Sequence, residues 1–211
     1  MSTLSTLDDL CQRLGGIDSG RIRLHPAPGT ATVADVIELH DQGGVLCELI
    51  EGVLVEKATG FSASTIGGVM FALLNAFVIP RNLGIVNPAD GTIELMPDLI
   101  RIPDVAFTSW DRLPGRCHPT DAVPAVVPNL AVEVLSRSNT SGEMTLKRQD
   151  YFSSGVELVW EIDPRSRTIR VYPSLTNVTT LTTADTLDGG AVLPGFTVAV
   201  SQVFAELDRR G

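Results

Sequence analysis

Hydrophobic positions along the chain switch between helical spacing and short apolar runs, a pattern that predicts a mixed α/β fold. Thr32 has the character of an N-cap, and apolar residues at helical spacing follow it up to Gln42. Residues 62–81 form the longest helical pattern and are apolar almost all round, so we expect a helix buried in the core rather than one on the surface. The capping box that begins at Thr140 predicts a further helix, which extends to Ser154 and ends at Gly155.

Short apolar runs bounded by Gly, Pro or polar residues predict the strands. Two of them, residues 45–50 and 53–56, flank the pair Glu51 and Gly52 and predict a hairpin, because glycine accepts the positive φ of a tight turn. Further strands are expected within residues 84–87, 92–96, 103–107, 128–135, 156–162, 168–172, 178–181 and 191–198.

The pattern indicates one domain over residues 32–208, preceded by a weakly patterned N-terminal extension over residues 1–31. Residues 110–127 are rich in Pro, Gly and polar side chains and predict a long loop, which we expect close to the functional site.

Composition narrows the class of protein. The 211 residues carry a formal net charge of −9, which opposes generic nucleic-acid binding without excluding a locally basic cleft, because phosphate contacts require Lys and Arg. Three widely spaced cysteines without a Cys-x-x-Cys pair argue against a zinc site and a disulfide framework, and favour reduced thiols in a cytoplasm. No secretory signal is visible, and the longest apolar stretch, residues 66–79, is shorter than the roughly 20 residues of a membrane span. We therefore expect a soluble cytoplasmic protein with no membrane partner.

Two of the predicted interior strands each carry a carboxylate, Asp104 after Pro103 and Glu133 among Leu, Ala and Val residues. Burying an ionised acid in such surroundings costs roughly several kcal/mol in desolvation, unless a cation or hydrogen-bond donors meet it. We expect Asp104 and Glu133 to lie side by side and to share a divalent metal, since two carboxylates suit Mg²⁺. The alternative is that a buried Arg satisfies Glu133 and that Asp104 merely caps a turn.

Two further residues are candidates for this site. Lys147 shares a helical stripe with Met144 and Tyr151 and could face inward, although an exposed salt bridge from Glu143 to Lys147 explains the same spacing. Glu51 is either a third metal ligand or part of a solvated turn.

Other catalytic classes lack their motifs. Gly-x-Ser-x-Gly, Gly-x-Gly-x-x-Gly and the Walker phosphate loop are absent from the sequence, which disfavours serine hydrolysis and nucleotide cofactors. Aromatic residues make up only 5% of the chain, which makes a sugar hydrolase with stacking platforms a weaker reading. Arg101, Arg137 and Arg148 could contact phosphates, although isolated arginines are usually surface residues.

Four segments together resemble the Uma family of putative restriction endonucleases, in the PD-(D/E)XK nuclease superfamily. They are Glu48-Leu-Ile-Glu-Gly-Val-Leu-Val55, Ile102-Pro-Asp-Val-Ala-Phe107, Leu130-Ala-Val-Glu-Val-Leu-Ser136, and Tyr151-Phe152 with Val159-Trp-Glu-Ile-Asp-Pro164. The resemblance extends from about Val33 to Phe204. It implies an α/β, restriction-endonuclease-like fold, with a mixed central sheet flanked by helices and additional antiparallel hairpins.

The same resemblance implies a Mg²⁺-dependent site, with Mn²⁺ as a substitute, that cleaves DNA phosphodiester bonds. Asp104 and Glu133 match the acidic residues of the superfamily and would hold the metal. Leu135 stands where the standard Lys is found, and the family supplies that Lys from the following helix, so Lys147 takes the role of positioning the nucleophile. Glu51 would support a ligand or water. A homodimer is compatible with double-strand cleavage, and the alternative function is a catalytically inactive binding or scaffold protein with the same fold.

Overall fold

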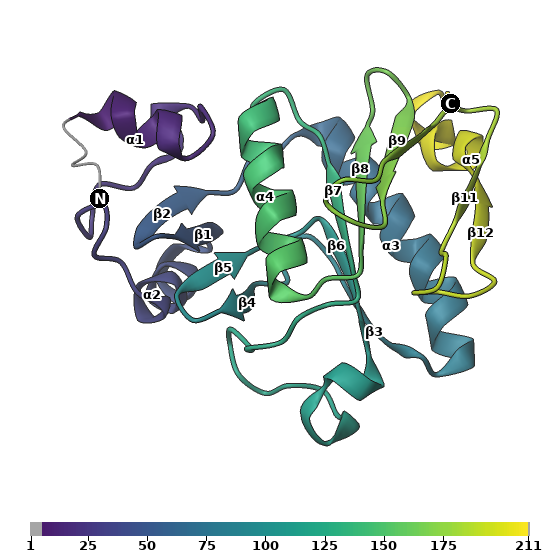
Figure 1. Ribbon diagram of the computed structural model, residues 1–211, viewed down its shortest axis with the longest axis horizontal. Coiled ribbons are helices and arrows are strands. Elements are labelled where there is room, and N and C mark those ends of the chain that lie inside the picture. The colour runs from purple at the N-terminus through teal and green to yellow at the C-terminus, as the bar shows by residue number, and fades with distance from the viewer. Residues whose placement is uncertain (1–5, 211) are drawn as a thin grey trace.

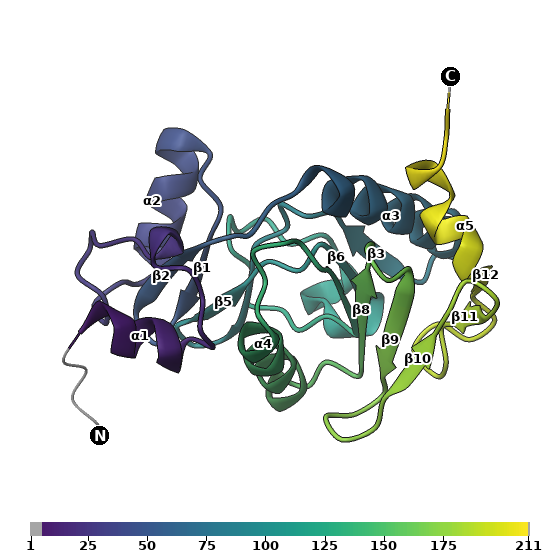
Figure 2. The same cartoon turned by 90° about the horizontal axis from the view of Figure 1, so that it is seen from above.

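The computed structural model describes residues 6–210 and has a mixed central sheet with helices on both faces (Figures 1 and 2). The helices are α1 (Leu7–Arg13), α2 (Val33–Gly43), α3 (Phe61–Arg81), α4 (Ser141–Ser154) and α5 (Val200–Phe204). The strands are β1 (Cys47–Ile50), β2 (Val53–Glu56), β3 (Gly84–Asn87), β4 (Ile93–Met96), β5 (Leu99–Arg101), β6 (Val105–Ser109), β7 (Leu130–Val134), β8 (Leu158–Asp163), β9 (Thr168–Tyr172), β10 (Thr179–Leu181), β11 (Thr186–Asp188) and β12 (Thr197–Ala199).

The central sheet has the strand order β10-β9-β8-β7-β6-β3. β7 and β8 are parallel and are joined through α4, whereas the other neighbours pair antiparallel. A second sheet, β2-β1-β5-β4, lies beside it and begins with the hairpin of β1 and β2. The expected fold class, a mixed sheet with added antiparallel hairpins, is therefore confirmed.

The side chains of strand β7 point alternately to the two faces of the central sheet. Leu130, Val132 and Val134 belong to the core cluster that includes the buried side of α3, and Ala131 belongs to the cluster that includes Tyr151 of α4. Because residues two apart in a strand share a face, Glu133 points with Ala131 towards α4, as the sequence pattern predicts.

Helix α3 buries only one face. Ile66, Met70 and Leu74 are fully buried at intervals of four residues, whereas Phe61 is 93% exposed and Ile79 is 67% exposed. The expectation that this helix is buried in the core rather than on the surface holds for one face only, because the sheet covers one side of the helix and α5 covers only part of the rest (Figure 2). By length and mean hydropathy, 1.7, this helix alone among the described residues could cross a membrane; in the structure its apolar stripe packs against the sheet.

The residues before α2 pack against the hairpin and α4 (Figure 1). Leu10 and Ile22 lie in one cluster with Val55 of β2, and the hydroxyl of Thr140 donates to the carbonyl oxygen of Gly15 at 2.6 Å. Gly15 has a φ of +88°, and a Cβ there would lie 2.3 Å from a backbone nitrogen of α4. The glycine therefore permits close contact between the N-terminal segment and the start of α4.

Two expectations about turns have different outcomes. The hairpin turn at Glu51 and Gly52 is confirmed, and both residues have positive φ, 51° and 72°. The expectation that residues 110–127 lie near the site was wrong. This segment follows the end of β6, whereas Asp104 precedes the start of β6, so the loop lies at the opposite edge of the sheet (Figure 1).

Candidate active site

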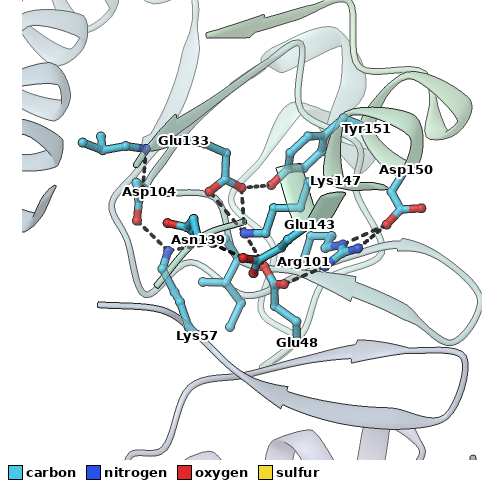
Figure 3. Close-up of polar contacts among 12 residues, drawn as sticks. Glu48, Lys57, Arg101, Asp104, Glu133, Asn139, Glu143, Lys147, Asp150 and Tyr151 are labelled. Atoms are coloured by element: carbon cyan, nitrogen blue, oxygen red, sulfur yellow. Dashed lines mark hydrogen bonds and ion pairs between the residues drawn. The ribbon is translucent and has the colours of Figure 1, made fainter. Parts of the chain in front are cut away.

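The antiparallel pairing of β6 and β7 brings Asp104 and Glu133 together. Asp104 immediately precedes β6 and Glu133 is the penultimate residue of β7, so both lie at the same edge of the sheet. The backbone N–H of Val134 donates to Asp104 Oδ2 at 2.7 Å, and the Asp104 N–H donates to the carbonyl of Val132 at 2.9 Å. The structure thus places the two acids next to each other, as expected (Figure 3).

Glu133 is buried and is held by two side chains of α4. The Lys147 ammonium donates to both carboxylate oxygens of Glu133, at 3.1 and 3.2 Å, and the Tyr151 hydroxyl donates to Oε1 at 2.5 Å. The inward-facing stripe of Met144, Lys147 and Tyr151 is confirmed, since all three are buried. The alternative of an exposed Glu143–Lys147 pair was wrong. So was the alternative of a buried Arg on Glu133.

Asp104 meets the other lysine of the chain. Lys57, the residue after β2, lies with its Nζ 2.9 Å from Asp104 Oδ1 and donates to the carbonyl of Ile102 at 2.6 Å. Asp104 is partly exposed, with 14% of its side-chain surface accessible. Each of the two acids therefore has its own lysine, and Asp104 does more than cap a turn.

Glu48 completes the cluster. This residue of β1 is 1% exposed, accepts from Arg101 at 2.7 Å, and lies 2.9 Å from the Lys147 ammonium. The backbone N–H of Ile102 also donates to it, at 3.2 Å. Lys147 consequently bridges two buried carboxylates, Glu48 and Glu133 (Figure 3).

Glu51 does not join this cluster. It lies on the exposed turn of the hairpin, with 61% of its side-chain surface accessible, and pairs with Arg13 at 3.1 Å. The solvated-turn alternative describes its position. The hairpin instead contributes Glu48, three residues earlier, because that residue lies within a strand and not on the turn.

A surrounding set of ion pairs fixes the cluster. Arg101, which is 2% exposed, binds Asp150 of α4 at 2.9 and 2.5 Å as well as Glu48. Glu143 accepts from Arg21 at 2.8 Å and from Asn139 at 3.0 Å. Bidentate and charge-assisted contacts of this kind hold side chains in one orientation.

The charges nearly balance. The carboxylates are Glu48, Asp104, Glu133, Glu143 and Asp150, and the cations are Arg21, Lys57, Arg101 and Lys147. When all are ionised, the cluster carries one excess negative charge, which would attract a further cation.

Burial and pairing shift the pKa values of the central groups. Burial alone would raise the pKa of Glu48, but Lys147 and Arg101 together hold it far below its usual range. For Glu133, burial raises the pKa and the neighbouring Asp104 adds to the rise, while Lys147 opposes it. Burial would lower the pKa of Lys147, but Glu133 and Glu48 raise it above its ordinary value. Burial and Glu133 raise the pKa of Tyr151, so its hydroxyl stays protonated and can donate.

The donor set fits a hard divalent cation in part. Asp104 and Glu133 offer only oxygen atoms, and Mg²⁺ commonly takes one or two carboxylates and completes its shell with water and substrate phosphate. Within residues 6–210, no group of three or more His, Cys, Asp or Glu side chains is arranged as a complete metal site. A site of two carboxylates completed by water and phosphate is the arrangement that these residues support.

Sequence reasoning missed Glu48 and Lys57 as parts of the site, and it named Arg101 only as a candidate phosphate contact, whereas the structure pairs it with Glu48 and Asp150. Glu48 and Arg101 each interrupt an apolar strand, the same signal that singled out Glu133. Lys57 has no such signal, because it follows the strand and its partner Asp104 is distant in sequence.

Comparison with known proteins places this chain in a family. A solved structure with a similar fold is that of a putative nuclease belonging to DUF820 from Anabaena variabilis ATCC 29413, with a TM-score of 0.68 and 18% sequence identity; the match covers 78% of this chain and 92% of that one. No functionally curated protein matches this sequence. Residues 33–201 match the family model Uma2, described as putative restriction endonuclease. The chain therefore belongs to the Uma2 family of putative restriction endonucleases.

Proposed function

We propose that this protein is a divalent-metal-dependent endonuclease that hydrolyses DNA phosphodiester bonds. One observation carries the proposal: Asp104 and Glu133 come from separate segments and lie together at one edge of the sheet, with the Lys147 ammonium on Glu133. Membership of a family of putative nucleases supports the same reaction class.

Each residue has a role that follows from its contacts. Asp104 and Glu133 would hold Mg²⁺ or Mn²⁺, which when bound supplies an activated water and stabilises charge on the phosphoryl group. Lys147 stays protonated, so it acts as a cation that orients water or stabilises charge and not as a base. Tyr151 fixes the orientation of Glu133, and Glu48 fixes that of Lys147.

A binding or scaffold protein that keeps the fold without cleaving is the second candidate. Two observations favour it: Lys57 and Lys147 already compensate the two acids, and the net charge of −9 weakens attraction to DNA. The two candidates differ in whether a metal binds the folded protein and in whether the acids are needed for cleavage.

Plasmid nicking with Mg²⁺ or Mn²⁺ tests the proposal. The wild type should nick supercoiled DNA, and Asp104→Asn and Glu133→Gln should each lose on the order of 100-fold or more in rate, as for removal of a group that stabilises the transition state. Equal nicking by all three proteins would indicate a contaminating nuclease. Under linkage, Mg²⁺ should also raise the melting temperature of the wild type but not of Asp104→Asn.

The two hairpin acids provide a matched comparison. Glu48→Gln removes a partner of Lys147, whereas Glu51→Gln removes only an exposed pair with Arg13. Nicking should therefore fall more in Glu48→Gln than in Glu51→Gln. A larger loss of nicking in Glu51→Gln than in Glu48→Gln would assign Glu51 to the site and contradict the assignment of Glu48.

A further inference from the structure

Helix α3 begins with an aromatic side chain in solvent. Phe61, the first residue of α3, is 93% exposed and borders a groove of about 530 Å³. Single exposed apolar residues are common and need no explanation by themselves. What sets Phe61 apart is the groove beside it and the charge of that groove.

The groove lies next to the end of β7 that carries Glu133. Its wall includes Leu135 and Ser136, which directly follow β7 and its Glu133, and Thr59, which lies two residues after Lys57. A neighbouring depression shares Thr59 and Arg137 with it and includes Lys57 itself. A strand lying in this groove would therefore pass the edge of the sheet where Asp104 and Glu133 lie.

The groove also holds a cation that is free to bind an anion. All 16 Lys and Arg residues lie within the described part of the chain, and there only Arg81, Arg137 and Arg210 have no acidic partner within ion-pair distance. Arg81 lies over the ring of Phe77 at the other end of α3, and Arg210 is next to the C-terminus. Arg137 is thus the unpaired guanidinium beside the site.

Arg165, which also lines the groove, adds a second positive charge. It has only a long contact, 3.5 Å, to Asp163 and its side chain is 66% exposed. With Arg137 it makes this groove positive on a protein whose other cations are mostly neutralised.

We propose that this groove binds single-stranded or locally unpaired DNA, with Phe61 stacked on a base and Arg137 on a phosphate. The inference rests on the proposed endonuclease function and names the class of its substrate. Binding of a duplex through many phosphates needs many free cations, which the described surface lacks near the site. An aromatic platform with one or two cations instead suits an unpaired strand, because stacking supplies affinity that does not depend on sequence.

Fluorescence anisotropy without divalent metal measures this binding separately from cleavage. The probes are a labelled oligodeoxythymidine and a labelled DNA duplex of the same length. The wild type should bind the single strand more tightly. Phe61→Ala should weaken that binding about tenfold, the effect of losing one stacked base, which corresponds to about 1.4 kcal/mol. Arg137→Gln should lower the slope of log K against log salt by about 0.7, the value for one phosphate of a single strand.

The other end of α3 supplies matched controls. Ile79→Ala removes an exposed apolar side chain, and Arg81→Gln removes a cation without an acidic partner. Both should leave the affinity for the single strand unchanged.

Unchanged affinity in Phe61→Ala, an equal loss in Ile79→Ala, or tighter binding of the duplex by the wild type would overturn the inference. So would a shift of the sedimentation coefficient in Phe61→Ala without loss of DNA binding, which would assign Phe61 to a contact between copies of the chain. If the wild type nicks plasmid while Phe61→Ala binds normally, only the groove is rejected. If the wild type binds through Phe61 but never nicks, the endonuclease is rejected.

Discussion

Replacing Lys147 by Met gives the sharpest test of how the candidate active site is held together. Methionine is unbranched and one atom shorter than lysine, so it fills most of the same space and removes the charge that lies 3.1 Å from Glu133 and 2.9 Å from Glu48. Glu48 retains Arg101 at 2.7 Å, but within residues 6–210 the Glu133 carboxylate retains only the hydroxyl of Tyr151 as a hydrogen-bond donor. The cost of the substitution therefore falls mainly on Glu133.

The size of that cost has an upper bound. A buried carboxylate without a cation escapes its desolvation penalty by taking up a proton, and at pH 7 protonation of a group with an unfolded pKa of about 4.3 costs about 3.7 kcal/mol. We expect Lys147→Met to lower the free energy of unfolding by about 2–4 kcal/mol at pH 7. At about 2–4 °C per kcal/mol for a chain of this size, the melting temperature should fall by roughly 5–15 °C.

The loss should depend on pH with a definite sign. Lys147 is the main group that opposes the rise in the pKa of Glu133, so its removal raises the folded pKa further above the unfolded value than in the wild type. The folded variant therefore gains more stability than the folded wild type as the pH falls. The deficit should shrink to about 1 kcal/mol at pH 5, where protonation costs little. The double variant Lys147→Met with Glu133→Gln has no buried charge to neutralise at this position and should regain most of the loss.

Urea denaturation of the wild type and the single and double variants at pH 5 and pH 7 measures all these quantities. A loss below about 1 kcal/mol at pH 7, an equal loss at both pH values, or a double variant as unstable as the single would refute the account of the buried Glu133–Lys147 pair.

Other predictions concern stability and use matched variants. Gly52→Ala should lower the free energy of unfolding, measured in urea, more than Gly155→Ala does. Both glycines have positive φ, 72° and 101°. A Cβ at Gly52 would lie 2.6 Å from a backbone carbon, whereas nothing lies within 4 Å of a Cβ at Gly155. Equal costs would contradict the close approach. Leu74→Ala, at a fully buried position of α3, should lower the free energy of unfolding by about 2–5 kcal/mol. Ile79→Ala, at a 67% exposed position of the same helix, should lower it by less than about 0.5 kcal/mol. Similar melting temperatures of the two variants would contradict the one-sided burial of the helix. Lys147 and Arg101 hold the pKa of Glu48 below its unfolded value. The contribution of ionised Glu48 to the free energy of unfolding is therefore complete above about pH 4.3 and is lost as the pH falls further. The difference in stability between the wild type and Glu48→Gln should consequently narrow in acid. A gap that widens in acid would reverse the assigned sign.

Local patterns predicted much of the fold and part of the site. The hairpin, the capped helix α4 and the inward stripe that carries Lys147 and Tyr151 each follow from spacing within a few residues. The isolated carboxylate of Glu133 was visible because an acid within an apolar strand requires a partner. Features of this kind depend on neighbours in sequence, which the pattern contains.

The features that sequence reasoning missed depend on contacts between distant segments. Glu48 and Glu51 belong to the same hairpin, and only the position of β1 against β5 shows that Glu48 meets Arg101. Lys57 reaches Asp104 across the gap between two sheets. The sequence likewise could not predict which side of α3 is exposed, because the helix is apolar almost all round and the neighbouring elements decide which side is covered.

The contact of the N-terminal segment with α4 has a consequence for how the protein can be studied. Residues 7–32 lie outside the family-matching region, yet Arg21 pairs with Glu143 and Gly15 accepts from Thr140 at the start of the helix that carries Lys147. A version trimmed to the shared family boundaries would lose both attachments and leave that turn of the helix open to water. Weak activity in such a shortened protein would then show that Lys147 is no longer held in place. It would say nothing about the activity of the intact chain.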